Sequence, residues 1–318
     1  MTDLEFRPAT LDDVDFCTDV CSVARPFAPL DPVVERYWWE NPDDNWVQRR
    51  FVVSRAGTPI GAASFGHPRW EIASFRFGGV NADVIAECRD VATISALLKE
   101  MGSRLVADGA TTVSTRANED DAVLIDAIAR LGFREDRRGR RWVLDLVANR
   151  ELILDMTENC RERMRAQGVR LLTLADDDDP EKYRQVHELS NEAEHDVPST
   201  LPVVEGTLDD YLRWFRAPNI REDRFWLARE GGRIVGVSVL GYPPVRGPVG
   251  TEWTATARSV RGRGIARAVK CETLAQAIAL GVDRVRTGND AANDPILHIN
   301  ATMGYRPVVG SINFLKHA

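Results

Sequence analysis

The chain has 318 residues, of which 44% are hydrophobic and 28% are charged, and its net charge is -7. This length favours two domains over one, and the acidic balance argues against nucleic acid or an anionic membrane as a partner. No apolar run approaches the ~20 residues that span a bilayer. The acidic N-terminus also lacks a secretory signal, so we expect a cytoplasmic protein.

The cysteines and histidines predict neither a disulfide framework nor a metal site. There are five cysteines, an odd number at irregular spacing. Cys17 and Cys21 are four residues apart and fit two buried thiols on one helix face better than half of a metal site. No two histidines have metal-ligand spacing, so we expect no metal. Arginine far outnumbers lysine, which indicates a GC-rich bacterial genome.

In chain order, the first half reads as a strand near residues 4–7, helices, a hairpin over 50–61, a helix, a strand near 111–115 and a helix that closes at 131–134. The segment 78–90 precedes one of these helices. It lacks a glycine-rich turn and carries Asp83, Glu87 and Asp90, whose charges would repel a phosphate. A helix with one narrow apolar stripe is expected over 149–167.

The second half repeats this pattern at an offset of roughly 170 residues, which is typical of a duplicated domain rather than a solenoid. It begins with a strand near 169–174 and a run of acidic residues at 176–181. We interpret that run as a helix N-cap with proline at the first helical position, in preference to a calcium site. The hairpin recurs at 224–236 and the closing segment at 303–306. Each half therefore predicts a mixed sheet with helices on both faces, an α/β (α+β) class.

A glycine-rich turn, Arg261-Gly262-Arg263-Gly264-Ile265-Ala266, separates an expected strand at 250–257 from an expected helix at 265–280. Such a turn gathers unpaired backbone N–H groups at the positive end of the helix dipole, and its glycines let an anion approach the backbone. This geometry binds phosphate, although the six residues alone also fit a surface turn.

These segments together resemble the GNAT acyltransferase superfamily. Its pyrophosphate motif, Gln/Arg-x-x-Gly-x-Gly/Ala, is matched by Arg261, Gly264 and Ala266, and its closing signature by Asn293 and Gly304-Tyr305. The resemblance covers nearly all of 169–318 and, more weakly, the first half. It implies two tandem GNAT folds, each a mostly antiparallel sheet flanked by helices, in the arrangement of mycothiol synthase and its relatives. We expect a degenerate domain at 1–148, a linker helix at 149–168 and a coenzyme-binding domain at 169–318.

The resemblance implies acetyl-CoA as cosubstrate, bound by the second half alone. The first half is expected to buttress it or to shape the acceptor pocket. The coenzyme contacts it implies are Thr254, Ala255, Thr256, Arg261, Gly262, Arg263, Gly264, Ile265, Ala266, Arg267 and Asn293.

Two residues are candidates for catalysis. Glu252 is the one carboxylate on its strand, and simple alternation places it on one face with Thr254 and Thr256. It fits a general base, acting directly or through water, and it also fits a solvated or salt-bridged strand residue. The family's tyrosine acid aligns with Asn300, which cannot release a proton but can hydrogen-bond the coenzyme sulfur or the substrate.

The acceptor is weakly encoded. The resemblance implies N-acetyl transfer to the amine of a small molecule, and places the loop 192–206 toward that acceptor. Its acidic residues Glu192, Glu194 and Asp196 fit a solvated loop better than a binding site for a cationic amine. O-acyl transfer would use the same site. The alternative function is a non-catalytic acyl-CoA-binding sensor or scaffold, and a monomer or a homodimer is expected.

Overall fold

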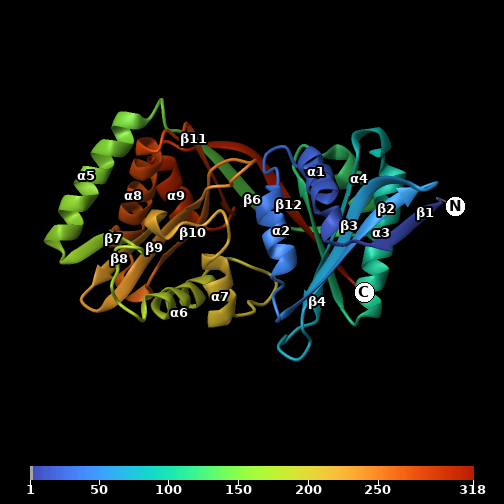
Figure 1. Cartoon of the computed structure of the whole chain (residues 1–318), viewed down its shortest axis with the longest axis horizontal. Helices are drawn as coiled ribbons and strands as arrows, with labels where there is room; N and C mark the ends of the chain where they lie inside the picture. The colour runs from blue at the N-terminus through green and yellow to red at the C-terminus, as the bar shows by residue number, and fades with distance from the viewer. Residues whose placement is uncertain (1–2) are drawn as a thin grey trace.

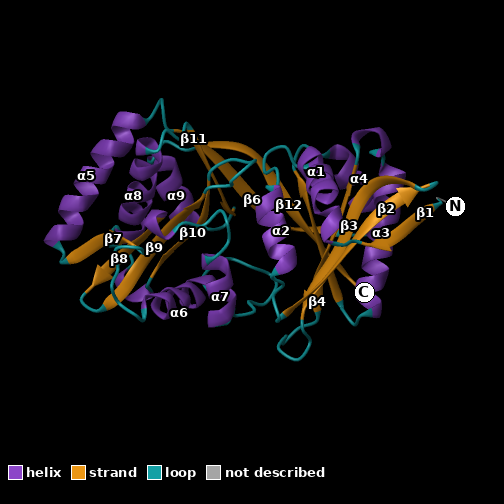
Figure 2. Ribbon diagram, in the orientation of Figure 1, coloured by secondary structure: helices purple, strands orange, loops and turns teal. Residues whose placement is uncertain are grey.

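The structure is a computed structural model that describes residues 3–318, and it contains the predicted elements in the predicted order (Figure 2). The first half comprises β1 (Leu4–Pro8), α1 (Val14–Ala24), α2 (Pro32–Glu40), β2 (Trp46–Arg55), β3 (Thr58–Pro68), β4 (Phe77–Val84), α3 (Val91–Ala107), β5 (Thr112–Asn118), α4 (Ala122–Arg130) and β6 (Arg134–Asp145).

Helix α5 (Arg150–Ala166) joins this series to a second one of the same pattern. The second half comprises β7 (Val169–Thr173), α6 (Lys182–Glu194), α7 (Leu208–Phe215), β8 (Phe225–Glu230), β9 (Arg233–Gly241), β10 (Gly250–Thr256), α8 (Ile265–Ala279), β11 (Arg284–Asp290), α9 (Asp294–Thr302) and β12 (Arg306–His317). No helix within residues 3–318 is long and apolar enough to cross a membrane.

Glycines at a positive φ end the matching helices of the two halves. Gly132 follows α4 with φ of +81°, and Gly304 follows α9 with φ of +87°. This left-handed conformation suits glycine because it has no Cβ, and it turns the chain sharply from each helix into the next strand. The predicted closing segments therefore have the same local geometry in both halves.

All the strands belong to one continuous sheet. Its order is β1-β2-β3-β4-β5-β12-β6-β11-β10-β9-β8-β7, and only the β4–β5 and β10–β11 pairs are parallel. The predicted mixed, mostly antiparallel fold is confirmed. Figure 1 shows the first-half helices α1 to α4 gathered at one end of the sheet and α5 to α9 at the other.

The two halves exchange their last strands at the centre of this sheet. Strand β12 pairs with β5 of the first half over Ser311–His317, while β6 pairs with β11 of the second half over Gly139–Asp145. In Figure 1 the red C-terminal strand accordingly runs into the blue first half, where the C-terminus lies. Sequence periodicity does not reveal the exchange, because it reports which residues form strands and not which strands pair.

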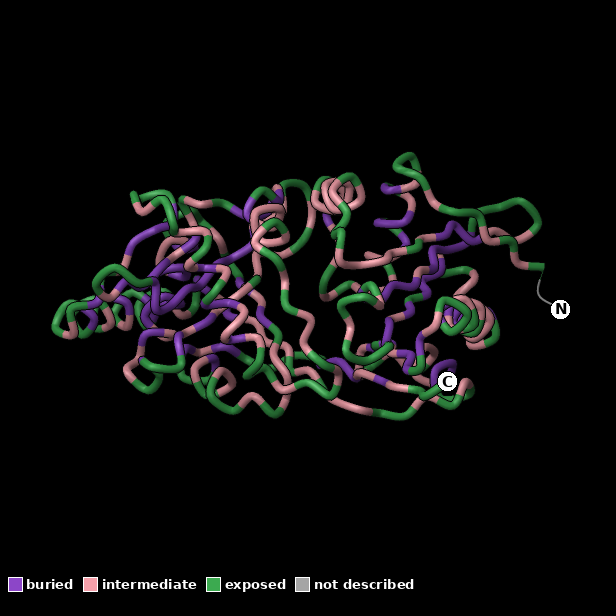
Figure 3. The backbone as a smooth tube through the Cα atoms, turned by 90° about the horizontal axis from the view of Figure 1, so that it is seen from below, coloured by how far each residue is buried: buried purple, intermediate pink, exposed green. Residues whose placement is uncertain are grey.

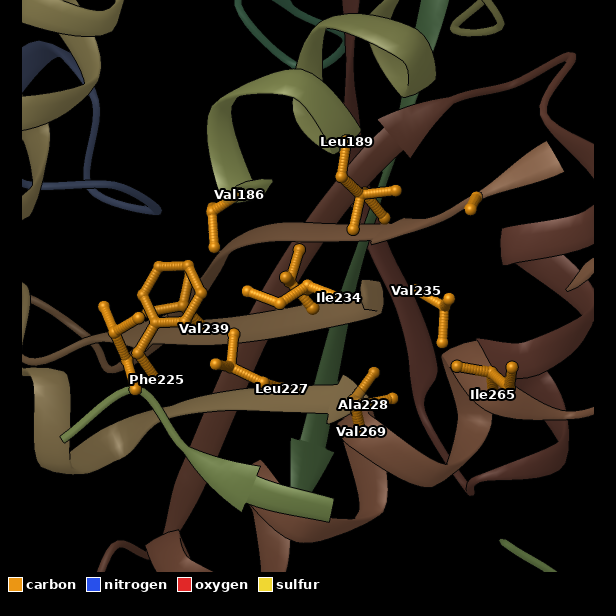
Figure 4. Packing of buried hydrophobic residues seen from close by; sticks show 14 of the residues in the cluster. Val186, Leu189, Phe225, Leu227, Ala228, Ile234, Val235, Val239, Ile265 and Val269 are labelled. Carbon is orange, nitrogen blue, oxygen red and sulfur yellow. The ribbon is translucent and has the colours of Figure 1, made fainter. Parts of the chain in front are cut away.

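Each half has its own apolar core. In the second half, α6 and α8 pack on β8 and β9 through Val186, Phe225, Leu227, Val239 and Val269, which are buried (Figure 4). In the first half, α3 and α4 pack on β3 to β5, and the exchanged strand β12 adds Ile312 and Phe314. Figure 3 shows the buried segments within both halves and exposed backbone around them.

The acidic run at 176–181 does not act mainly as a helix cap. Helix α6 begins at Lys182, so Pro180 lies two residues before it and not at its first position. Asp177 and Asp179 instead hold the buried guanidinium of Arg229 at 2.7 and 3.0 Å. An arginine buried in the core needs paired carboxylates, and that need decides the local structure.

Candidate functional site

A cavity of about 1510 Å³ lies between the two halves and receives residues from both. From the second half come β10, the turn before α8 and the start of α9. From the first half come β4, β5 and β6. Its walls carry ten arginine or lysine residues and six aspartate or glutamate residues, whereas the chain as a whole is acidic. The cavity therefore suits a negatively charged ligand.

The turn before α8 opens into this cavity with its backbone amides free. Gly262 and Gly264 have φ of +77° and +89°, and Gly264 is the N-cap of α8. The amides of Gly262, Arg263 and Gly264 donate to no other residue of 3–318, and the first amides of α8 lack intrahelical acceptors. A positive helix end with unpaired donors is an anion site.

The arginines around this turn divide into two groups. Arg261 and Arg267 line the cavity, as does Arg163 of α5. The Arg163 guanidinium lies so close to Gly264 that a Cβ added there would meet it at 3.3 Å. Arg263 points away, because its guanidinium bonds Glu230 at 2.8 Å and Gln167 at 3.1 Å. The predicted coenzyme contact by the Arg263 side chain therefore has no support, and Arg163 was missed by the motif because it lies on the joining helix.

Arg261 is already engaged in this structure. Its Nη2 donates to Oδ2 of Asp196 at 2.6 Å, and Arg258 donates to the same carboxylate at 2.8 Å. These two hydrogen bonds lower the pKa of Asp196 to about 2. The acidic loop 192–206 thus binds arginines of the phosphate turn, and its charges are less available to a cationic acceptor than the sequence suggested.

Strands β10 and β11 separate directly after they meet. Their parallel ladder has a single register pair, Gly250 with Arg286, and beyond it the β11-facing edge of β10 is free. Strand β10 also bulges between Thr251 and Trp253. The bulge interrupts alternation at Glu252, so the predicted common face of Glu252, Thr254 and Thr256 does not follow from a regular strand.

Some of the residues predicted to contact the coenzyme from β10 and from the turn can offer it only backbone groups. Ala255 and Ile265 are 4% and 1% exposed and belong to the core. The hydroxyl of Thr254 bonds Ser238 at 3.0 Å, whereas the hydroxyl of Thr256 is buried without a partner in the described chain. All of them, with Gly262, Ala266 and Asn293, line the cavity.

Glu252 stands where two cavities meet. It lines the large cavity and a second one of about 320 Å³, which Tyr211, Trp214 and Trp253 also line. Its carboxylate accepts a hydrogen bond from Nδ2 of Asn219 at 3.0 Å. Glu252 is exposed by its accessible area, because its side chain opens onto these cavities. The protein around the cavities still raises the pKa of its carboxyl, although the Asn219 bond opposes the shift. Among residues 3–318, Glu252 makes no ion pair, so the salt-bridged interpretation has no support, while a general base and a solvated strand residue both fit the structure.

Asn300 lies outside the cavity. It is fully buried in α9, and its Nδ2 donates to Asn289 at 2.8 Å. A contact with a coenzyme sulfur is therefore unsupported in this arrangement. Asn293, by contrast, is the N-cap of α9, makes no side-chain cap bond and faces the cavity.

Lys270 is a cavity residue that the sequence analysis missed. It is 2% exposed and lines the large cavity, and burial lowers the pKa of its ammonium to about 8. Its Nζ forms no hydrogen bond or ion pair with residues 3–318 and lies 5.4 Å from the centre of the Tyr305 ring. A lysine inside the otherwise apolar stretch of α8, in a chain with four lysines, was the available signal.

The equivalent turn of the first half is closed. Asp90 caps α3 by accepting from the Thr93 amide at 2.8 Å. Next to it, Arg89 forms a short ion pair with Asp121, the N-cap of α4. The carboxylate of Asp90 occupies the place where the α8 turn presents free amides.

Comparisons with known proteins agree with this geometry. Residues 183–305 match the model of the Acetyltransferase (GNAT) family, while no curated protein matches the chain. A tandem GNAT protein from the clavulanic acid biosynthesis pathway has a TM-score of 0.73 at 17% identity, over 99% of this chain and 98% of that one. A GCN5-related N-acetyltransferase from Sphaerobacter thermophilus has a TM-score of 0.69 at 18% identity, over 100% and 96%. Residues 183–305 therefore form a domain of the Acetyltransferase (GNAT) family in the second half, and the chain as a whole has the fold of the solved tandem GNAT protein.

Proposed function

We propose that the chain is an acetyl-CoA-dependent N-acetyltransferase that acetylates the amine of a small molecule, with its active site in the second half. The observation that carries this proposal is the turn at 261–266, whose free amides and two left-handed glycines face the central cavity beside the open edge of β10. The first half has no comparable turn.

Separate groups of residues bind the diphosphate and the pantetheine arm of the coenzyme. Amides of the turn, with Arg163 and Arg261, hold the diphosphate of the coenzyme. The free edge of β10 near Thr254 to Thr256 pairs with the pantetheine arm and directs an amide toward the thioester oxygen, where negative charge develops. Arg261 must leave Asp196 for this, so the acidic loop competes with the phosphate.

Glu252 is proposed as the general base. The amine nitrogen attacks the thioester carbonyl, the new C–N bond forms, and the C–S bond breaks as the tetrahedral intermediate collapses. Glu252 accepts the proton that the nitrogen loses, directly or through water, and its raised pKa makes it a stronger base than an ordinary glutamate. The thiolate leaves without a side-chain acid at Asn300 and takes its proton from water.

The proposal also covers the domain organisation and the cellular setting. The division into domains at 1–148 and 169–318 stays a proposal, with α5 as more than a linker because it carries Arg163 over the turn. A cytoplasmic setting is proposed from the five cysteines, which are all free thiols, and a bacterial source from the excess of arginine over lysine. We expect no metal requirement.

The test is a calorimetric titration with acetyl-CoA. The wild type should bind one molecule per chain. Arg261→Gln should weaken binding about tenfold by removing one charge-assisted contact. Gly264→Val should weaken it about a hundredfold, because a β-branched residue cannot adopt φ of +89° without moving the turn. Arg284→Gln, an exposed arginine of β11, is the matched control and should bind normally.

Two outcomes would contradict the proposal. Wild-type affinity in Gly264→Val would place the coenzyme elsewhere. Tight binding without CoA release across a broad amine panel would favour the sensor alternative, for which the burial of Asn300 is the supporting observation.

A further inference from the structure

The positive charge of the central cavity exceeds what the coenzyme turn accounts for. Arg163, Arg261 and Arg267 cluster around that turn, but other arginines line the opposite, first-half wall. Six arginines line that wall, and three of them are neutralised. Arg137 is paired with Asp290 at 2.6 Å, Arg25 with Asp83 at 2.5 Å, and Arg89 with Asp121.

Arg116, Arg140 and Arg141 are the exceptions, and of these the exposed Arg140 has no side-chain hydrogen bond within residues 3–318 to orient it. Arg116 lies on β5 and Arg141 on β6, both facing the cavity, and neither forms an ion pair with any carboxylate of residues 3–318. Each is held by a neutral amide instead. Arg116 Nε donates to Asn313 at 2.7 Å, and Arg141 Nη1 donates to Asn118 at 2.6 Å. An asparagine oxygen orients a guanidinium without cancelling its charge.

A further contact fixes the position of Arg141. Its Cζ lies 5.2 Å from the centre of the Phe27 ring, and the Cζ of Arg286 lies 4.5 Å from the same ring. An aromatic face attracts a guanidinium but does not neutralise it. Two arginines thus share one ring at the edge of this wall.

The crowding has an electrostatic consequence. Desolvation inside the cavity lowers the pKa of Arg116, although its side chain is exposed to that cavity, and the nearby charge of Arg25 lowers the pKa further. Burial also lowers the pKa of Arg141, with Arg116 as the next cause, while Asp120 and Glu119 oppose the shift. Like charges therefore lie close together on this wall without a directly paired carboxylate, and an anionic ligand would relieve their repulsion.

We propose that Arg116 and Arg141 form an acceptor subsite that binds an oxyanion, a carboxylate or a phosphate, on the same molecule that carries the reacting amine. This inference rests on the proposed function, because it assigns the substrate class of that active site. A guanidinium binds either oxyanion through two parallel hydrogen bonds. The acceptor class is then an amino acid, an amino sugar acid or an aminoalkyl phosphate, rather than a polycation.

The strand exchange is what assembles this subsite. Arg116 belongs to β5, its partner Asn313 to β12 and Arg141 to β6, and these three strands are adjacent only because β12 lies between β5 and β6. The first half thus contributes the anion subsite, and the second half contributes the proposed coenzyme turn and Glu252.

The first experiment measures anion binding without turnover. Inorganic phosphate and succinate are titrated separately while the melting temperature is followed, with acetyl-CoA at saturation so that the α8 turn is occupied, and again without it. The wild type should show saturable stabilisation by at least one of the two anions, and the preferred one identifies phosphate or carboxylate as the ligand group. Arg116→Gln and Arg141→Gln should each weaken this binding at least tenfold. Arg138→Gln, on β6 but paired with Glu135 and outside the cavity, should leave it unchanged.

A second readout separates a ligand site from a structural one. Without anions, Arg116→Gln and Arg141→Gln should melt at or above the wild-type temperature, because each removes a repelling charge. If either variant melts well below the wild type, or if neither anion stabilises the wild type, or if the variants respond as the wild type does, the subsite is overturned.

The last experiment connects the subsite to the reaction and keeps the two proposals apart. CoA release is compared for glycine against glycinamide and for 2-aminoethyl phosphate against ethanolamine. The anionic member of at least one pair should have a kcat/KM at least tenfold higher, and Arg116→Gln should remove that preference while binding acetyl-CoA normally. Weakened acetyl-CoA binding in Arg116→Gln would reassign the arginines to the coenzyme. Failure of the wild type to bind acetyl-CoA would instead defeat the proposed function and leave the anion titration to decide the subsite.

Discussion

The turns before α3 and α8 occupy equivalent places in two copies of one fold and differ in what they present. Before α8, glycines at 262 and 264 leave the amides bare. Before α3, Asp90 caps the helix with its own carboxylate, and the neighbouring Arg89 is paired with Asp121. The comparison teaches that a helix end binds an anion only when the chain does not supply one of its own.

The strands that lead into these turns differ in a similar way. The parallel pairing ends at Gly250 in β10 and at Gly79 in β4. Two residues further along, the equivalent positions are Glu252 and Asn81. Both line the central cavity. A carboxylate can accept a proton and a neutral amide cannot, so the copies differ in proton chemistry as well as in phosphate binding.

The most decisive test of this difference gives position 252 an amide and position 81 a carboxylate. Glu252→Gln should lower kcat by about 10²- to 10⁴-fold, the range for loss of a general base, while Asn81→Asp should change kcat less than about threefold. CoA release measures both. A large loss from Asn81→Asp with an active Glu252→Gln would place the reaction in the wrong half.

The pH dependence sharpens the same point. Because the protein around the cavities raises the pKa of Glu252, the rising limb of kcat against pH should lie above the range of an ordinary glutamate, and it should vanish in Glu252→Gln. Folding disfavours the charged form of this carboxylate, so its ionisation costs stability as the pH rises through that window. Glu252→Gln should therefore melt no lower than the wild type at neutral pH, and a clear drop would indicate a structural role.

The equivalent helices α3 and α8 also differ, because only α8 has a buried lysine. Lys270 is buried in α8, whereas Lys99 of α3 is exposed. Folding lowers the pKa of Lys270 from 10.5 to about 8, which corresponds to roughly 3 kcal/mol of destabilisation. Lys270→Met should recover up to about that amount in denaturant unfolding near pH 7, and Lys99→Met should change little.

The direction of the pH dependence follows from the number of protons that the folded and the unfolded chain bind at Lys270. Between pH 8 and 10.5 the unfolded chain holds a proton at Lys270 that the folded chain has released, so wild-type stability rises with pH there. The advantage of Lys270→Met should be complete below that window and fade across it. An advantage that persists at pH 11 would show that packing, and not charge, causes the effect.

The smallest effect is expected from opening the first-half turn. Asp90→Ala removes the cap of α3 and should cost about 1 kcal/mol in unfolding free energy. It should not create a second acetyl-CoA site, because no residue of the turn 85–90 has the positive φ that exposes the amides before α8. A stoichiometry that rises from one to two in calorimetry would show that the cap alone separates the two copies.

Local patterns in the sequence predicted the elements well. Neighbouring residues determine the hairpins, the helices that end at glycine and the turn at 261–266. In the structure each of these lies within a few residues of its expected bounds. The closed first-half turn was also indicated, through the acidic residues at 78–90.

The site itself was only partly predictable. Arg163, Arg116 and Arg141 face the cavity because of pairings between segments far apart in the chain, which no local period encodes. The bulge at Glu252 and the outward turn of Arg263 depend on cross-strand register and on Glu230, a partner from another hairpin. Asn300 was placed by counting along a motif, and counting cannot show that its side chain faces the interior.

The exchanged strand also bears on how the chain is made. Ile312 and Phe314 belong to the core of the first half, yet they are synthesised after every other strand of the sheet. Until β12 emerges, β5 presents a bare edge, and vectorial folding cannot complete the N-terminal copy before then. A truncation that removes β12 would thus damage the half of the molecule that was translated first.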